Sequence, residues 1–233
     1  MVMEQIVAII VFALVLVFVW GTFKKLFKLL FYTGIIISLL LAANMFFVYQ
    51  DFNDLRKNFG VSEKKVILKN DNEILTGLLL NEDAKLMTNK QLDDYSSYLK
   101  NNNYKKILGD SYKLMIFDVD IIKNLDDEIV IEGQTITPNE AITILRSRKN
   151  NAEEKAALFS TILSDEILSS RNPLFFFSEF KNDNILIYPE TALFKTIKFI
   201  PLALIEDVGK KIFEKTKEKA KGFVASKQEN IEE

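Results

Sequence analysis

Two long apolar stretches at the start of the chain limit what the first 50 residues can form. The first runs from Ile6 to Trp20 without a polar residue and continues uncharged to Phe23. The second, Leu29 to Tyr49, is also uncharged. Helices over about 18 and about 21 residues measure roughly 27 and 31 Å, close to the ~30 Å hydrocarbon core of a bilayer. The sequence therefore predicts a transmembrane helical hairpin in residues 1–50, with helices at about 5–23 and 29–49.

Small residues recur every four positions in the second apolar stretch, at Gly34, Ser38 and Ala42. Residues at this spacing share one face of a helix, and small residues let helices approach closely in lipid. We expect this face to pack against the first helix or against another copy of the chain. A small channel or a transporter accessory, assembled from several copies through the same face, is an alternative interpretation.

Basic residues predict the orientation of the hairpin. Lys24, Lys25 and Lys28 lie between the two stretches, and short basic loops prefer the cytoplasm. The opposing signal is a group of basic residues soon after the second stretch, but Asp51 and Asp54 precede it, and long domains translocate largely regardless of charge. We therefore expect an integral protein of the cell membrane whose large domain is extracytoplasmic.

The composition excludes several classes of function. The chain of 233 residues has no cysteine and no histidine, which excludes disulfides, thiolate zinc sites and cysteine nucleophiles and removes the commonest general base. A net charge of −2 provides no basic surface of the kind that binds nucleic acid. We expect no cofactor and no nucleic-acid partner, so any chemistry must come from carboxylates, Lys, Tyr, Ser or Thr.

Apolar runs and turn residues predict an α+β domain over residues 64–213, preceded by a connector at 51–63 and followed by a charged helical tail at 214–233. Hairpins are expected around Asn70–Asn72, over 113–131 and around Asn182–Asn184. Helices are expected to start at Thr88 or Asn89, at the capping box Thr137–Glu140, at Asn151 and near Glu190. The order is ββα-ββαα-ββα. It predicts one antiparallel sheet of hairpins with helices packed on one face.

The helix expected from Glu190 is amphipathic, and its apolar side either packs over the sheet or faces the membrane surface or a partner helix. The run Phe175–Phe177 is predicted to be part of a buried strand, and the alternatives are a membrane-dipping loop or the wall of a ligand site. These two segments would complete the third hairpin-and-helix unit of the domain.

Asp118 and Asp120 are the candidate metal ligands. They lie two residues apart in the predicted strand Lys113–Ile122, so both carboxylates would project from one face and could bind Mg²⁺ or Ca²⁺. That arrangement suggests a membrane-tethered hydrolase that depends on carboxylates and a divalent ion. The alternative is the solvent-exposed face of a half-covered sheet.

No other catalytic constellation is evident in the sequence. The leading hypothesis is therefore a membrane-anchored binding, scaffolding or assembly protein that presents an α+β domain and has no catalytic activity. Its expected partners are the lipid bilayer and either another protein or a second copy that associates through the transmembrane helices.

Overall fold

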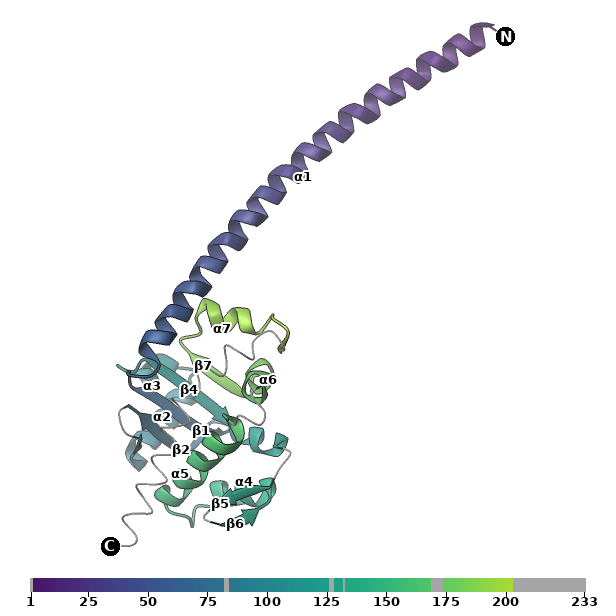
Figure 1. Ribbon diagram of the computed structural model, residues 1–233. Coiled ribbons are helices and arrows are strands. Elements are labelled where there is room, and N and C mark those ends of the chain that lie inside the picture. Colours follow the sequence, from purple (N-terminus) through teal and green to yellow (C-terminus); the bar gives the residue numbers. More distant parts are fainter. Residues whose placement is uncertain (1, 82–83, 126–127, 132, 169–173, 203–233) are drawn as a thin grey trace. The chain divides into compact units, whose positions relative to one another are not determined.

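The computed structural model describes residues 2–81, 84–125, 128–131, 133–168 and 174–202 (Figure 1). The chain forms two compact units, Met1–Phe47 and Val48–Glu233. The long amphipathic helix expected from Glu190 is wrong within the described residues, because α7 (Ala192–Ile197) ends before Pro201, which cannot donate a backbone hydrogen bond. The sequence predictions for residues 203–233, which include the charged tail, lie outside the described residues.

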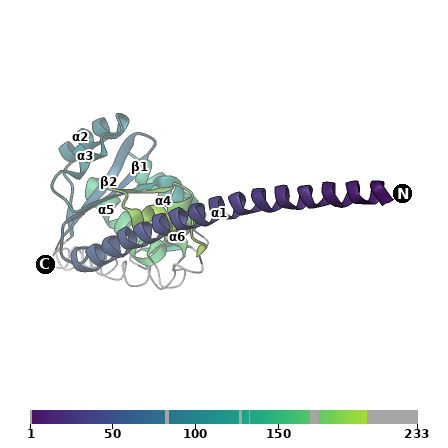
Figure 2. The same ribbon diagram turned by 90° about the horizontal axis from the view of Figure 1, so that it is seen from above.

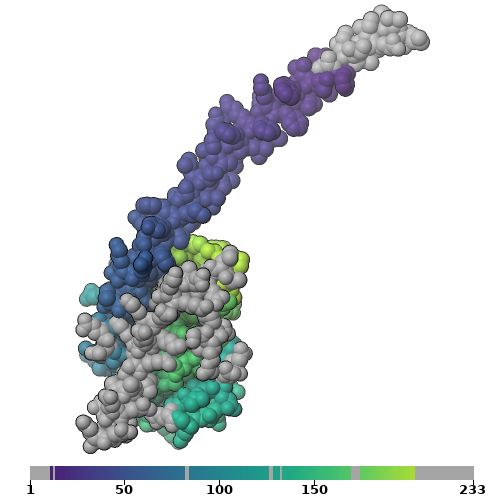
Figure 3. Space-filling view, in the orientation of Figure 1, coloured from purple at the N-terminus to yellow at the C-terminus, as the bar shows by residue number. Residues whose placement is uncertain are grey.

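The apolar start of the chain forms one continuous helix, α1 (Val2–Asn58), without the break that a helical hairpin needs at residues 24–28. That segment, Lys-Lys-Leu-Phe-Lys, contains no Gly or Pro, and Lys and Leu favour helix. Large apolar side chains along Val11–Phe47 are exposed by 40% or more (Figure 3). The stretch Leu14–Asn58 is long and apolar enough to cross a membrane.

The second unit contains a five-stranded sheet in the order β3-β2-β1-β4-β7. Its strands are β1 (Lys64–Asn70), β2 (Glu73–Leu80), β3 (Ala84–Leu86), β4 (Lys113–Asp118) and β7 (Ile185–Tyr188). The predicted hairpin β1–β2 is confirmed, with Asp71 in the left-handed conformation at its turn. However, β1 and β4 are parallel, so the sheet is mixed and the prediction of a purely antiparallel sheet is wrong.

Helices cover both faces of this sheet, not one face as predicted (Figure 2). On one face, α2 (Asn89–Lys100) and α3 (Tyr104–Leu108) carry the chain from β3 back to the start of β4. That return across the sheet is what makes β4 parallel to β1. On the other face lie α4 (Pro138–Arg146), α5 (Ala152–Thr161), α6 (Phe175–Lys181) and α7 (Ala192–Ile197).

Three predicted helix starts are confirmed by their caps, and at the start of α5 the Asn151 side chain accepts a hydrogen bond from the Glu154 N–H. The other two starts, at Thr88 and Thr137, have threonine caps. The side chain of Thr88 accepts a hydrogen bond from the Gln91 N–H at the start of α2, and Thr137 does the same for Glu140 at the start of α4. In both caps the residue at the third helical position accepts a hydrogen bond from the N–H of the capping threonine. These are reciprocal capping boxes.

The second predicted hairpin is wrong. The strand expected over 113–122 ends at Asp118, because the Asp118 side chain accepts a hydrogen bond from the Asp120 N–H and starts a 3₁₀ helix, η1 (Val119–Asn124). The following β5 (Ile129–Ile131) pairs with β6 (Gln134–Ile136) in a separate two-stranded sheet. The helix α5 continues as a π-helix, η2 (Ile162–Ile167).

The third predicted hairpin is also wrong, because the phenylalanine-rich segment is the helix α6 and not a strand. Phe175, Phe176, Phe177 and Phe180 are all buried. A helix that is buried on nearly every side gives an unbroken apolar run, and periodicity alone does not distinguish such a run from a buried strand.

The last turns of α1 belong to the second unit and form part of its core. Leu55 is 1% exposed and Phe59, just beyond the helix, is 4% exposed. Both lie in the larger apolar cluster of the domain, with Val48 and Phe52 packed against it. The segment 51–63, expected to be a polar connector, therefore places apolar side chains inside the domain.

Two aspartates on the polar side of these turns fix α1 to the sheet and to α7. Asp51 Oδ2 accepts a hydrogen bond from the Leu193 N–H at 3.0 Å, in the first turn of α7. Asp54 Oδ2 accepts a hydrogen bond from the Tyr112 hydroxyl at 2.5 Å, immediately before β4. These contacts connect the end of α1 to two elements that are far from it in the sequence.

The hydroxyl of Tyr112 should ionise at a higher pH than an unperturbed tyrosine. Burial, the hydrogen bond to Asp54 and the charges of Asp54 and Asp51 raise the pKa of its hydroxyl above the ordinary 10.0. Above pH 10 the folded protein therefore binds more protons than the unfolded chain, and its stability falls as pH rises. A spectrophotometric titration of the tyrosine hydroxyls checks this. Tyr112→Phe should remove the component that titrates at the highest pH, and Asp54→Asn should move that component to lower pH. Loss of a component near pH 10 in Tyr112→Phe would contradict the assignment.

Candidate functional site

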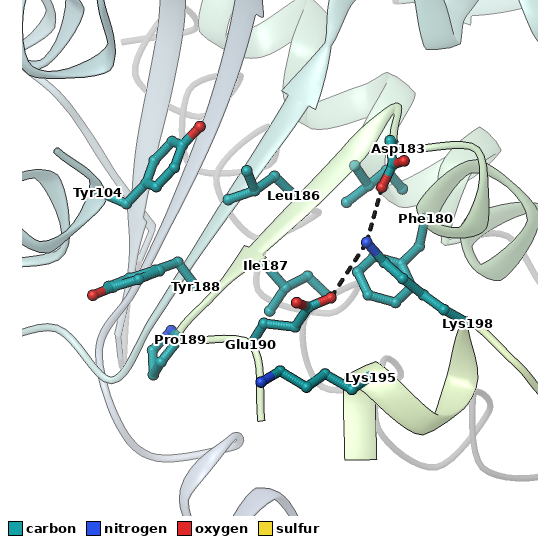
Figure 4. A pocket seen from close by; sticks show the side chains of 11 residues that line it. Tyr104, Phe180, Asp183, Leu186, Ile187, Tyr188, Pro189, Glu190, Lys195 and Lys198 are labelled. Atoms are coloured by element: carbon teal, nitrogen blue, oxygen red, sulfur yellow. Dashed lines mark hydrogen bonds and ion pairs between the residues drawn. The ribbon is translucent and has the colours of Figure 1, made fainter. Parts of the chain in front are cut away.

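A groove with a volume of about 600 Å³ follows β7, at one edge of the five-stranded sheet (Figure 4). Its walls come from α3, the end of α6, β7, the segment after β7, and α7. The lining residues are Tyr104, Phe180, Asp183, Ile185–Tyr188, Pro189, Glu190, Lys195 and Lys198.

The main-chain groups of β7 alternate between β4 and the outer side of the strand, and the outward-facing residues Ile185 and Ile187 are only 1% and 3% exposed, main chain included. The carbonyl of Asn184 accepts a hydrogen bond from the Asp118 N–H at 2.9 Å, so the main-chain groups of Asn184 face β4. In an antiparallel pair, alternate residues face the same neighbour, so Leu186 and Tyr188 also face β4, while Ile185 and Ile187 face outward. No strand within the described residues pairs with this outer edge.

Aromatic and apolar side chains line the groove on the α3 side of β7. The rings of Tyr104 and Tyr188 lie 5.9 Å apart at an angle of 40°, and Leu186 is half-buried beside them (Figure 4). The Tyr104 hydroxyl donates a hydrogen bond to Asn102 Oδ1 at 3.1 Å, which fixes the ring at the rim.

Charged side chains line the groove on the α7 side. Lys198 Nζ lies 2.8 Å from Asp183 Oδ1 and 3.3 Å from Glu190 Oε1 (Figure 4). It also lies 5.1 Å from the centre of the Phe180 ring. Hydrogen bonding to Asp183 and then to Glu190 raises the pKa of Lys198, so this lysine stays charged and neutralises one of the two carboxylates.

Lys195 supplies the fourth charge of the groove. Its side chain is exposed and projects from α7 toward the mouth of the groove, near Glu190 (Figure 4). Two lysines and two carboxylates balance overall. However, Lys198 bonds both carboxylates, whereas Lys195 forms no ion pair within the part of the chain that the structure describes. The ammonium group of Lys195 is therefore available to an incoming carboxylate.

Lysine–carbonyl contacts hold the walls of the groove. Lys181 Nζ donates to the carbonyls of Ile197, Lys198 and Ile200 at 3.3, 2.9 and 2.8 Å, which satisfies the end of α7. Lys113 Nζ donates to the Pro189 carbonyl at 3.1 Å, directly after β7. Burial lowers the pKa of Lys113, opposed by the charges of Asp54 and Asp51.

The predicted metal ligands Asp118 and Asp120 do not share a strand face, because Asp118 ends β4 and Asp120 lies in η1. Asp118 Oδ2 is paired with Lys69 Nζ, and Asp120 Oδ1 lies 2.8 Å from Lys123 Nζ and 3.2 Å from Arg146. The hydrogen bond to Lys123, with the nearby cations, lowers the pKa of Asp120. Both carboxylates are thus neutralised by basic side chains, and the metal-dependent hydrolase stays a prediction without support from these contacts.

The described residues also contain no cluster of three or more acidic side chains arranged to hold a metal ion. Gly34, Ser38 and Ala42, the predicted helix-packing residues, are exposed on α1. A Cβ added at Gly34 would meet no atom within 4 Å. The small-residue face is therefore uncovered, and its use in helix packing stays a prediction.

The sequence did not indicate the groove. Its residues come from four segments between Tyr104 and Lys198, and the sequence does not show that Ile185–Tyr188 is an edge strand. The one local signal is that this strand is uncharged and is followed closely by Lys195 and Lys198.

Comparison with protein-family models, with curated proteins and with solved structures finds no match to this chain.

Proposed function

We propose that this chain is a membrane-anchored binding or assembly protein, in which α1 anchors the α+β domain and the groove at β7 is the binding surface. The observation that carries this proposal is the contrast along α1. Its large apolar side chains are exposed from Val11 to Phe47. About two helical turns later, Leu55 is 1% exposed in the domain core. An exposed apolar surface of this length requires lipid or protein to cover it.

We further propose that α1 bends at residues 24–28 when it enters a bilayer, so that both apolar stretches span it. A straight helix of 57 residues is about 86 Å long, nearly three times the ~30 Å hydrocarbon core. If it entered straight, only one apolar stretch could lie in the bilayer. A bend lets both apolar stretches lie in the hydrocarbon core and keeps Lys24, Lys25 and Lys28 in water, since a lysine at the centre of the bilayer costs about 2.5–3.5 kcal/mol.

Cysteine accessibility tests the anchor and its topology, because the chain has no native cysteine. Val2→Cys, Lys25→Cys and Val130→Cys are each expressed in cells and labelled with a membrane-impermeant maleimide from one side. With two spans and an extracytoplasmic domain, positions 2 and 130 should react from outside and position 25 only after the cells are opened. If only the second stretch spans, position 2 should behave like position 25.

Fractionation of the same cells tests membrane attachment itself. Because about 40 apolar residues of α1 would lie in the bilayer, the full chain should remain in the pellet after alkaline extraction. A chain that lacks residues 1–47 should move to the supernatant. Full-length protein in the supernatant without detergent would overturn the proposed anchor.

A further inference from the structure

We infer that the turn at the end of α7 docks on the surface of the bilayer and inserts the Phe199 side chain among the lipid headgroups. The inference rests on the proposed membrane anchor and adds a second, peripheral contact between the α+β domain and lipid. Three observations carry it: how closely the domain follows the apolar stretch of α1, how far Phe199 is exposed, and how firmly its turn is held.

The domain begins directly at the end of the second apolar stretch. A helix over residues 29–49 is about 31 Å long and fills the ~30 Å hydrocarbon core, so Tyr49 lies at the boundary of the core. Val48, one residue earlier, already packs against the larger apolar cluster of the domain. No spacer therefore separates the folded domain from the lipid that holds the anchor.

Helix α7 lies beside the turn of α1 that leaves the hydrocarbon core. Asp51 Oδ2 accepts the hydrogen bond from the Leu193 N–H at 3.0 Å, and Asp51 is only about 3 Å beyond Tyr49 along the helix. The headgroup layer adds roughly 5–7 Å on each side of the core. The first turn of α7 is therefore at the level of the headgroups, and Phe199 follows Leu193 within about 9 Å at the rise of a helix.

Phe199 is the most exposed large apolar side chain of the described residues, at 87%. The described apolar side chains of α1, which face lipid in the proposed anchor, are exposed by at most 73%. The apolar side of α7 itself, which consists of Leu193, Phe194 and Ile197, is buried in the domain. The helix thus covers the sheet and leaves only the aromatic side chain after it outside, where contact with lipid removes apolar surface from water.

The turn that presents Phe199 is fixed from inside the domain. Lys181 Nζ donates to the carbonyls of Lys198 and Ile200 at 2.9 and 2.8 Å, on both sides of Phe199. The N–H groups of Phe199 and Ile200 both donate to the Thr196 carbonyl, at 3.0 and 3.2 Å. Phe199 therefore projects from a pre-organised turn, and its insertion costs little ordering of the backbone.

Lipid fits this surface better than a second protein. A specific protein interface buries about 800 Å² on each partner, whereas Phe199 is one of only three exposed large apolar side chains outside α1 in the described residues, with Val61 and Val130. Aromatic side chains at the bilayer surface need no complementary shape. The two lysines and two carboxylates of the neighbouring groove balance, so insertion of the ring and not attraction to anionic lipid carries the contact.

Nitroxide depth measurement on the full chain in phosphatidylcholine nanodiscs tests the docking. The chain has no native cysteine, so Phe199→Cys and Val130→Cys each carry a single label. Val130 is the control because it is also apolar and exposed, but lies in β5, at the far end of the domain from α7 (Figure 1). Oxygen concentrates in lipid, and a nickel chelate stays in water. The label at position 199 should be more accessible to oxygen, at a depth of about 5–10 Å in the interface, and the label at position 130 more accessible to the nickel chelate.

A matched pair of substitutions tests the phenylalanine itself. In nanodiscs, Phe199→Ser should speed amide exchange over residues 197–200 by roughly tenfold, because lipid contact of the ring no longer opposes opening of the turn. Val130→Ser should leave that exchange unchanged. In an amphipathic polymer without a bilayer, Phe199→Ser should not change the same amides, because the ring is 87% exposed and contributes little packing to the domain.

Three results would overturn the docking: a label at position 199 that is more accessible to the nickel chelate, a label there that is shielded from both reagents, as contact with protein would produce, or equal exchange in Phe199→Ser and the unchanged chain. In each case, a Leu40→Cys label accessible only to oxygen would show that the anchor stands. Failure of the chain to enter nanodiscs would refute the anchor and, with it, the docking.

Discussion

Leu55→Ala is expected to lower the free energy of unfolding of the domain by about 3 kcal/mol. Leu55 is 1% exposed and lies in the larger apolar cluster together with Leu193 and Phe194 of α7. Truncation would remove its buried surface and leave a cavity where α1 packs against the domain. Denaturant unfolding of the full chain in nanodiscs, followed by circular dichroism, measures the change.

Arg56→Ala is the matched control for this experiment. Arg56 is exposed and follows Leu55 directly in α1, so its truncation should change the free energy of unfolding by no more than about 0.5 kcal/mol. Equal stabilities of Leu55→Ala and Arg56→Ala would mean that the last turns of α1 are not part of the core. In that case the anchor would be a separable helix.

The same packing connects the anchor with the groove. Leu193 contributes to the cluster that contains Leu55, and its N–H donates to Asp51 of α1. Lys195 follows two residues later in the same short helix. A looser contact between α1 and α7 should therefore disturb the α7 wall of the groove as well as lower the stability of the domain.

Features encoded by neighbouring residues were predictable from the sequence. The capping residues Thr88 and Thr137 and the hairpin at Asp71 depend on side chains within a few positions, so their patterns predicted them. The apolar length of α1 was evident for the same reason. The continuous helix through Lys24–Lys28 was not predicted. The predicted hairpin assumed that both apolar stretches lie in a bilayer, and residues 24–28 themselves contain nothing that breaks a helix.

Features that depend on long-range packing were not predictable. The parallel pairing of β1 with β4 results from where α2 and α3 return the chain, and no residue within the strands encodes it. In the same way, Phe175–Phe177 became helix because helices and sheet bury that segment on several sides. Asp118 and Asp120 could be placed near a strand end, but their basic partners come from β1, η1 and α4.

Buried lysines are the most unexpected feature of the core, because lysine is seldom fully buried. Lys64, Lys65 and Lys113 are 1%, 7% and 2% exposed at the start of the parallel strands β1 and β4. Lys65 Nζ donates to the carbonyls of Ile107 and Leu108 at 2.9 and 3.1 Å, and to the Tyr95 hydroxyl at 3.0 Å. It thereby satisfies the carbonyls at the end of α3, a helix whose first residue is Tyr104 of the groove.

Lys65→Met should lower the free energy of unfolding by about 2 kcal/mol, the second largest effect that we expect from a single substitution. Methionine fills a similar volume, but it leaves the buried carbonyl of Ile107 without the lysine donor, at about 1–3 kcal/mol, whereas the Leu108 carbonyl keeps its hydrogen bond from the Ser111 N–H. Tyr95→Phe removes only one hydrogen bond to the same ammonium and should cost about 1 kcal/mol. Denaturant unfolding of both variants compares them directly. If Lys65→Met were as stable as Tyr95→Phe, the ammonium would contribute nothing to holding α3 against the sheet, and the α3 wall of the groove would depend on apolar packing alone.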